Sequence, residues 1–509
     1  AELLEAGTQV YDKATEAMRP ARPRDVAVLT YTHAKASAAA AALEAHGIPV
    51  RVQQDGWLSS LAMRAARAAM TLVADPDDVN AALTWLTLGP PRVPLEDALR
   101  NAVDGVLATH VSLLPLRALN EEVAVRPVAE TLAHVLRAGA LRDWAAGLAL
   151  DPPTFSLRRG GWLSLDDWRA QARDRLLARI APPERGAIPT PEVVRTVEHD
   201  GLHIEELRWR MPVGPPVEAV FLKPAGATAP LPGVLALHDH GGDKVHGWRK
   251  VAETDAPRSP MIQRHLDWLY SGRPWANDLA KRGYAVLATD GLAFGSRRVR
   301  LADVPERIRD DLPTAPPVSE DEIRAYNRWA SGYESTFARS LFSAGTTWPG
   351  VTLADDRTAL DVLCNRPDVD ADRVACGGLS GGGLRTVYLG GVDPRVKAAF
   401  CVSMMTTWTD FVLNKSHTHT WMVYAPLLPN ELDYPEILGL RAPLPTLVQM
   451  NRQDRLFTFA ETERADAILR DVFERADAAD AYTGAVYDGD HAFPLPLQID
   501  AFEWLDRTL

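Results

Sequence analysis

The sequence is poor in cysteine, lacks long apolar runs and has no excess of basic residues. It contains three cysteines among 509 residues, and an odd number in apolar surroundings favours buried, reduced thiols over a disulfide framework. No segment approaches the roughly 18 consecutive apolar residues that a membrane-spanning helix needs. Acidic residues outnumber basic ones by 67 to 55, which gives a net charge of -12. We therefore expect no membrane partner, and nucleic acid is disfavoured because this charge repels polyanions.

Motifs for metals and phosphates are missing as well. No cluster of cysteine and histidine has the spacing of a zinc site, and the chain contains no Gly-Lys pair, which the phosphate loop of nucleotide hydrolases requires. The first residues, AELLEAGTQVYDK, have neither the basic region nor the apolar core of a signal peptide. These observations predict no metal, no cofactor and a cytoplasmic location, with secretion after removal of a signal left open.

What is present divides the chain into two parts. A length of 509 residues exceeds one ordinary core, and composition shifts to Pro, Gly and aromatic residues near 151–163. We expect a smaller, mostly helical α/β accessory domain over 1–150 and a larger domain over 151–509. In the first we expect a strand-helix-strand unit and three further helices, at 26–31, 34–45, 48–52, 60–75, 78–88 and 127–148.

The second part alternates between strand and helix patterns. Eight strands are expected, at 202–209, 217–224, 233–238, 284–290, 373–378, 396–402, 446–450 and 484–488. Such alternation predicts a mainly parallel sheet with helices on both faces, and the short turn between the first two strands predicts an antiparallel edge. Two long connections, 243–280 and 297–350, leave strand ends where α/β folds bind ligands. We expect them to be lids or disordered insertions.

The strongest local signal surrounds Ser380. The segment Gly378-Leu379-Ser380-Gly381-Gly382 lies between an apolar strand and a helix. A serine on such a tight turn has strained backbone angles and needs small neighbours. The turn also aims the N–H of Gly381 and the helix N-terminus at the place where negative charge would develop. The pattern predicts a nucleophile, with a structural or phosphate-binding glycine turn as the alternative.

A serine nucleophile needs a base, and the base needs an orienting acid. In folds with this turn the chain order is Ser, then Asp or Glu, then His. Asp454 follows the apolar segment TLVQM, and His491 follows the last expected strand. Both residues therefore fall where this order requires an acid and a base.

Other residues compete for these roles. Asp488 and Asp490 are alternative acids, but their adjacency to His491 in sequence would strain a contact with its ring. His417 and His419 precede the expected acid and break the order. We interpret these two histidines as pocket or structural residues.

A second oxyanion donor is expected in the loop after strand 233–238. The segment HDHGG at 238–242 occupies this loop. Because glycine lets the backbone approach a substrate oxygen closely, the sequence favours the N–H of Gly242 as the donor, with that of Gly241 or Asp243 as the alternative. A plain tight turn is the alternative interpretation.

Five stretches of the second part carry a family resemblance. They are ALHDHGG, LAKRGYAVLATDGLAFGSR, GLSGGGLRTVYLGGVDPRVKAAF, MVYAPLLPNELDYPEILGLRAPLPTLVQMNRQDRLF and YDGDHAFP. Residues 155–509 thereby resemble the dienelactone-hydrolase-related, acetylxylan-esterase-like branch of the α/β-hydrolases. The resemblance implies nucleophile Ser380, acid Asp454, base His491 and an oxyanion hole that includes His240 to Gly242. Relatives often carry Met or another side chain where this chain has Gly381. The glycine in this chain should leave the N–H donor intact.

The first part carries a fainter resemblance. The stretch RPRDVAVLTYTHAKASAAAAALEAHGIPVRV and the helical run to TLVADPDDVNAALTWLTL are similar to part of the second motor domain of superfamily 1 DNA helicases and helicase-nucleases. Such motors need the phosphate loop that this chain lacks. A generic accessory domain is the alternative interpretation.

Together these features predict a serine-dependent carboxylic ester hydrolase that acts through an acyl-enzyme on a small-molecule ester. The resemblance implies small acyl esters, such as acetylated carbohydrate. The expected substrate pocket comprises His240, Trp348, Trp408, Trp421 and Tyr424, whose aromatic rings could stack on a sugar. A peptidase-like or polyester-cleaving hydrolase and a nucleic-acid-associated module in residues 1–150 are the alternatives, and a homo-oligomer stays open.

Overall fold

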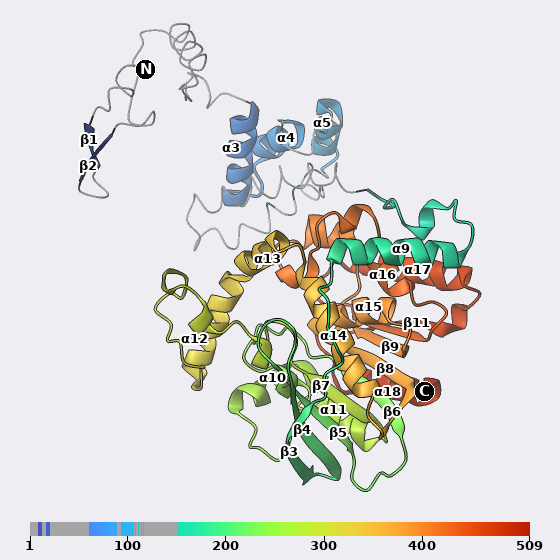
Figure 1. Ribbon diagram of the computed structural model, residues 1–509. Coiled ribbons are helices and arrows are strands. Elements are labelled where there is room, and N and C mark those ends of the chain that lie inside the picture. The colour runs from blue at the N-terminus through green and yellow to red at the C-terminus, as the bar shows by residue number, and fades with distance from the viewer. Residues whose placement is uncertain are drawn as a thin grey trace. The chain divides into compact units, whose positions relative to one another are not determined.

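The computed structural model describes residues 9–12, 17–20, 61–88, 93–105, 107, 110, 113, 116 and 150–509. The chain divides into two compact units, Ala1–Trp144 and Ala145–Leu509, and Figure 1 draws the described part of the first in blue. The expected elements at 26–31, 34–45, 48–52 and 127–148 lie outside the described residues. Among the helices within them, none combines the length and apolar character that a bilayer crossing demands.

The first unit has a small helical core. Its described elements are β1 (Gln9–Asp12), β2 (Ala17–Pro20), α3 (Leu61–Ala74), α4 (Val79–Leu88) and α5 (Leu95–Val103). α3 and α4 confirm two of the expected helices, and they pack through the buried side chains of Leu72, Trp85 and Leu86. β1 and β2 form an antiparallel pair.

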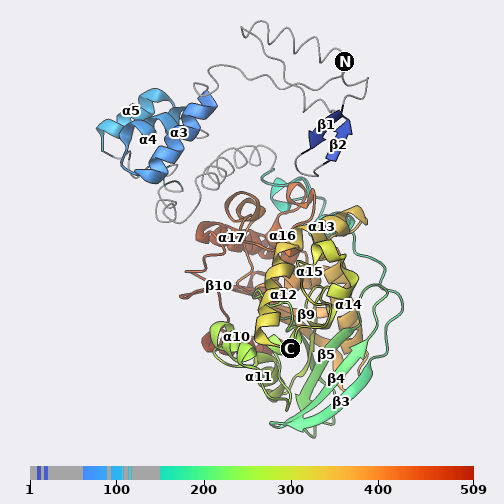
Figure 2. The same ribbon diagram turned by 90° about the vertical axis from the view of Figure 1, so that its left-hand side faces the viewer.

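The second unit is built on one sheet of nine strands, in the order β11-β10-β9-β8-β6-β7-β5-β4-β3. They are β3 (Glu192–His199), β4 (Leu202–Trp209), β5 (Val217–Pro224), β6 (Leu231–Ala236), β7 (Ala285–Thr289), β8 (Val369–Leu379), β9 (Val396–Val402), β10 (Thr446–Asn451) and β11 (Tyr482–Tyr487). From β11 to β7 all pairs are parallel, whereas β5, β4 and β3 pair antiparallel. Figure 2 shows this antiparallel edge in green. The mainly parallel sheet and its antiparallel edge are confirmed.

The expected number of eight strands is wrong by one, because β3 adds an outer edge strand. The first five residues of β3 are exposed, and none of its residues is fully buried. An edge strand of this kind lacks the apolar alternation that identifies a strand in sequence. Its neighbour β4 does bury alternate residues, among them Leu202 and Ile204.

Helices cover both faces of the sheet. The described helices of this unit are α9 (Leu165–Ile180), α10 (Pro260–Tyr270), α11 (Trp275–Lys281), α12 (Glu320–Gly332), α13 (Glu334–Ser343), α14 (Trp348–Cys364), α15 (Gly381–Val392), α16 (Tyr434–Gly439), α17 (Phe459–Arg475) and α18 (Leu495–Thr508). Helices α9, α14, α15, α16 and α17 contribute to one apolar cluster, and α10, α11 and α18 to the other. The sheet is therefore the middle layer of three.

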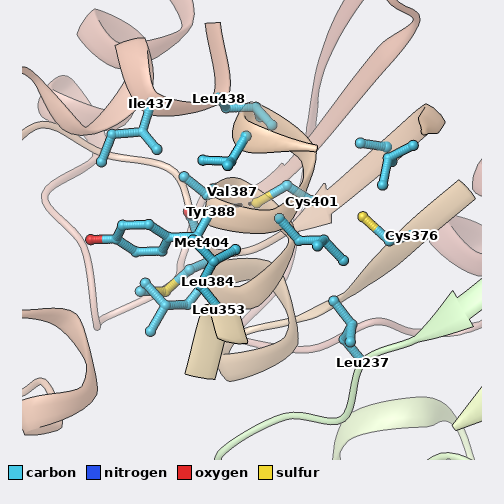
Figure 3. Packing of buried hydrophobic residues seen from close by; sticks show 14 of the residues in the cluster. Leu237, Leu353, Cys376, Leu384, Val387, Tyr388, Cys401, Met404, Ile437 and Leu438 are labelled. Carbon is cyan, nitrogen blue, oxygen red and sulfur yellow. Dashed lines mark hydrogen bonds between the residues drawn. The ribbon is translucent and has the colours of Figure 1, made fainter. Parts of the chain in front are cut away.

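Figure 3 shows part of the first cluster. Leu384 and Val387 of α15 pack there close to Cys401 of β9 and Met404. Cys376 and Cys401 are buried free thiols, and Cys364 is a partly buried one. Two of the three thiols are therefore buried, as the sequence predicts.

The two long connections are largely helical. The first contains α10 and most of α11, and the second contains α12, α13 and the start of α14. α12 begins with a capping box in which Ser319 and Glu322 bond each other's backbone, an arrangement that stabilises a helix start. Of the two alternatives for these connections, disordered insertions are therefore wrong, whereas lids stay a prediction.

The strand order reverses direction at β6. Its successor in sequence, β7, lies on one side of it, and β8 lies on the other. Loops that leave adjacent parallel strands on the two sides of such a switch diverge and open a crevice at the carboxyl edge of the sheet. The segment 238–242 follows β6 and Ser380 follows β8, so both reach this crevice.

Candidate active site

Ser380 occupies the turn between β8 and α15. Its backbone has φ 57° and ψ −116°, a conformation that costs energy in a residue with a side chain. A Cβ at Gly378 would lie 2.1 Å from the carbonyl oxygen of Leu237, and one at Gly382 would lie 2.0 Å from the same oxygen. The two flanking glycines are therefore required for the close passage of strand, turn and helix that the sequence pattern predicts.

Asp454 and His491 come together from two neighbouring loops. His491 Nδ1 lies 2.6 Å from Asp454 Oδ2, and the acid side chain is 3% exposed. The other carboxylate oxygen, Oδ1, accepts a hydrogen bond of 2.9 Å from Leu456 N. Gln453 N donates to the carbonyl of Gly489 at 3.0 Å, which ties the acid loop to the histidine loop. The carboxylate is thus fixed where it can orient the imidazole.

A cavity of about 780 Å³ opens at this edge of the sheet. Its lining brings together Ser380, Asp454 and His491 with His240, Gly241 and Gly242. Other chain segments complete the wall with Trp268, Ser331, Glu334, Thr418, His419, Thr420, Arg455, Leu456 and Asp490. Both long connections therefore contribute to the cavity, through α10 and through the α12–α13 region.

The competing residues have other surroundings. Asp490 lines the cavity, but the His491 ring contacts the Asp454 carboxylate, with Nδ1 2.6 Å from Oδ2. The side chain of Asp488 is 85% exposed, and its Oδ1 lies 3.4 Å from Arg452 Nε. His419 Nε2 lies 2.9 Å from the carbonyl oxygen of Leu456, and burial lowers the pKa of His419 to about 4. These contacts leave Asp454 as the candidate acid.

The oxyanion loop differs from the expectation. Gly242 N donates to His240 Nδ1 at 3.2 Å, so the N–H of Gly242 is engaged by a side chain. A Cβ at Gly381 would lie 2.8 Å from the His240 nitrogen, which puts this nitrogen beside the nucleophile turn. The backbone N–H of His240 replaces that of Gly242 as the candidate second donor. Sequence reasoning favoured glycine for close approach and missed the local hydrogen bond.

The ring of His240 belongs to a buried ionic network. Its Nε2 lies 3.0 Å from Glu334 Oε1 and 2.9 Å from Lys244 Nζ. Burial, and then the charge of Lys244, lower the pKa of His240 to about 4. The second oxygen of Glu334 accepts a hydrogen bond of 2.6 Å from Thr420 Oγ1. Glu334 therefore links the start of α13 to the oxyanion loop and to a third wall of the cavity.

The expected aromatic pocket is not formed as predicted. Trp348 and Trp408 are 1% and 3% exposed and belong to the hydrophobic core. Trp421 and Tyr424 pack against each other with ring centroids 6.1 Å apart, and none of the four lines the cavity described above. Trp268, which is 63% exposed, lines it instead. Its position on the polar side of an amphipathic helix was the one signal that could have found it.

A metal centre has no support among the residues that the structure describes. Within those ranges no group of three or more His, Cys, Asp or Glu side chains is placed to hold a metal ion. The cavity is instead lined by hydroxyl groups, two histidines beside the proposed base, and charged side chains.

Comparisons with known proteins cover about two thirds of the chain. No family model matches the chain. The chain is 27% identical over 346 residues to "Putative hydrolase YtaP" of Bacillus subtilis (strain 168), a match of 67% of this chain and 100% of the relative. A solved "putative acetyl xylan esterase" of Bacteroides fragilis NCTC 9343 superimposes with a TM-score of 0.50 at 16% identity, over 66% of this chain and 78% of the other.

A glucuronoyl esterase from Solibacter usitatus has a TM-score of 0.46 at 15% identity, over 67% of this chain and 93% of its own. The helicase resemblance of residues 1–150 is not shown by these relatives. The parallel sheet, the strand-to-helix turn and the solved relative agree on one architecture. The unit Ala145–Leu509 has the α/β-hydrolase fold.

Proposed function

We propose that this chain is a serine-dependent carboxylic ester hydrolase with Ser380 as nucleophile, His491 as base and Asp454 as the acid that orients it. The observation that carries the proposal is the cavity that joins the strained Ser380 turn to the bonded pair of Asp454 and His491. This combination is the requirement for activating a serine hydroxyl.

In the acylation step His491 Nε2 takes the proton of Ser380 as Oγ attacks the ester carbonyl. The resulting oxyanion is bound by the N–H groups of Gly381 and His240. The first N–H groups of a helix lack intrahelical acceptors, so Gly381, the first residue of α15, has its donor available. His491 then returns the proton to the leaving alcohol.

Deacylation repeats these steps with water. His491 takes a proton from the water as its oxygen attacks the acyl carbonyl, and the collapse of the second tetrahedral intermediate returns the proton to Ser380. Asp454 accepts the Nδ1–H bond throughout and stabilises the imidazolium. The products are a carboxylic acid and the free alcohol, and no step in this sequence calls for a cofactor.

For the substrate we propose small acyl esters, of which acetylated carbohydrate fits best. A volume of about 780 Å³ with hydroxyl and charged lining suits a polar alcohol, and the exposed ring of Trp268 could stack on a sugar face. The name of the Bacteroides protein points the same way. The peptidase-like, polyester and nucleic-acid alternatives have no comparable observation in their favour.

A fluorophosphonate probe tests the reaction class. It should label Ser380 in the native protein and fail to label Ser380→Ala, which should also lose hydrolysis of p-nitrophenyl acetate by orders of magnitude. Retention of most activity in folded Ser380→Ala would refute the proposal. A panel of acyl esters of increasing chain length, on sugar and non-sugar alcohols, then tests the substrate class.

A further inference from the structure

Lys250 is a fully buried lysine whose hydrogen bonds go to the oxyanion loop. It ends the short 3-10 helix η6 (Trp248–Lys250) and has no exposed surface. Its Nζ donates to the backbone oxygens of Asp239 at 3.0 Å and His240 at 2.9 Å. The nearest carboxylate oxygen, Oδ1 of Asp239, is 3.9 Å away. Since a buried ammonium is costly, its binding to two main-chain carbonyls calls for a reason.

The charge of this lysine has support around it. Burial lowers the pKa of Lys250, and the carboxylates of Asp239, Asp243 and Asp290 oppose that shift and favour the ammonium form. The ammonium also lies 4.6 Å from the ring centroid of Phe294, at a distance that suits a cation–π contact.

Each of the two carbonyls belongs to a peptide group that carries a loop N–H. The carbonyl carbon of Asp239 is bonded to the nitrogen of His240, and that of His240 to the nitrogen of Gly241. Neither peptide is among the cis bonds of the described residues, and in a planar trans peptide C=O and N–H point in opposite directions. Lys250 holds the oxygens, so both N–H groups point away from it, with the His240 nitrogen beside Gly381.

His238 adds a second donor to the first of these carbonyls. The backbone N–H of Gly291 donates to His238 Nε2 at 3.1 Å, which leaves the ring proton on Nδ1. His238 Nδ1 lies 2.8 Å from the Asp239 oxygen and therefore donates to it. One carbonyl oxygen thus accepts hydrogen bonds from an ammonium and an imidazole, both buried.

We propose that Lys250 is a positioning residue that polarises the oxyanion loop through the carbonyls of Asp239 and His240. The inference rests on the proposed ester hydrolysis and deepens it. A charge-assisted hydrogen bond to a peptide oxygen makes the N–H of the same peptide a stronger donor, and successive hydrogen bonds polarise one another where the local dielectric constant is low. The N–H of His240, the candidate second donor, thereby binds the developing oxyanion more strongly. Lys250 itself forms and breaks no covalent bond and touches no substrate.

Two substitutions separate the charge of Lys250 from its hydrogen bonds. Lys250→Met removes both, whereas Lys250→Gln keeps one neutral donor. Loss of a whole oxyanion donor costs about 10²- to 10³-fold in kcat. We expect about a tenfold to hundredfold lower kcat for Lys250→Met, a smaller loss for Lys250→Gln and a nearly unchanged KM in both. If Lys250→Met does not fold, the Gln variant decides the question.

The infrared stretch of the acyl-enzyme carbonyl gives a readout that a merely structural role would not move. Hydrogen bonds in the oxyanion hole lower this frequency, so an acyl group carrying ¹³C should show a higher frequency in both variants than in the wild-type protein. Arg441→Met is the matched control. It removes another buried cation that donates to main-chain carbonyls, but these, such as the carbonyls of Gly390 and Val396, lie outside the oxyanion loop, so the frequency should stay unchanged.

The outcomes separate this inference from the proposed function. Folded Lys250→Gln with unchanged kcat, or with reduced kcat and an unchanged carbonyl frequency, overturns the role of Lys250. Failure of the wild-type protein to form an acyl-enzyme on Ser380 refutes the proposed function itself. A fall in kcat that accompanies the frequency shift, in the Lys250 variants and not in Arg441→Met, supports the inference.

Discussion

Replacing Asp454 by Asn probes the orientation of the proposed base. The native carboxylate uses Oδ2 for His491 Nδ1 at 2.6 Å and Oδ1 for Leu456 N at 2.9 Å. An Asn side chain of equal size can keep the bond from Leu456 through its amide oxygen. Its NH₂ group then faces the imidazole and can only donate, so Nδ1 must become the acceptor. The ring proton moves to Nε2, where it blocks the acceptance of a proton from Ser380.

This wrong tautomer sets the size of the effect. Where the same exchange has been made in a Ser-His-Asp site, kcat falls about 10⁴-fold. We expect a loss of about 10³- to 10⁴-fold for Asp454→Asn, which corresponds to about 4 to 5.5 kcal/mol of transition-state stabilisation. The acid side chain is 3% exposed, so bulk solvent cannot substitute for it. KM should change little, because the amide and the carboxylate have the same volume.

The assay is hydrolysis of p-nitrophenyl acetate, with thermal unfolding followed by circular dichroism to confirm the fold. Asp490→Asn is the matched control, since Asp490 lines the same cavity and adjoins His491 in sequence. It should keep activity within about fivefold, because an exposed charge contributes about 1 kcal/mol or less. The reasoning is refuted if Asp454→Asn loses less than tenfold, or if Asp490→Asn is the more damaging change.

Three further predictions concern stability and the division of the chain. Gly382→Ala should lower the free energy of unfolding by about 1–3 kcal/mol and remove most of the activity, because its Cβ would lie 2.0 Å from the Leu237 oxygen. Gly332→Ala has open space around its Cβ and should leave the free energy of unfolding unchanged in denaturant titrations. Burial lowers the pKa of His419 to about 4, so on acidification the imidazole is protonated in the unfolded chain before it is protonated in the folded one. Up to about 3 kcal/mol of stability should therefore be lost as pH falls from 6.5 to 4. His419→Gln should flatten this loss, and an unchanged dependence of stability on pH in the variant would contradict the prediction. A fragment of residues 145–509 should fold and keep ester hydrolysis within about tenfold, and the full chain should show no DNA-stimulated ATPase activity; a soluble fragment whose turnover collapses would mean that the first unit shapes the site.

How far the sequence predicts this molecule depends on how local each feature is. The turn around Ser380 is predictable, because glycines that flank a serine between a strand and a helix describe it in five consecutive residues. The candidate acid and base are predictable through chain order, since Asp454 and His491 each follow a strand. Sequence alone also identifies the parallel sheet, whose strands are apolar because both faces are covered.

Features that depend on distant contacts escape the sequence. The engagement of the Gly242 N–H by the ring of His240 depends on one torsion of a side chain, which no pattern of residue types encodes. Glu334 and Lys250 lie in connections without a motif, and they acquire their partners only through the fold. The sequence predicts Trp348 in the pocket because of its residue type alone, but aromatic residues fill cores as readily as they line sites, and in the structure Trp348 lies in the core.

The arrangement of strands also sets when the site can exist during protein synthesis. Ser380 and its turn follow strand β8, whereas His491 follows strand β11, about a hundred residues later in the chain. A ribosome-bound chain that stops before β11 carries Ser380 without His491, its proposed base. Under the proposed function, such a nascent chain cannot hydrolyse esters. Under the proposed function, reactivity of Ser380 towards a fluorophosphonate therefore reports that synthesis has passed His491 and that the two residues have come together.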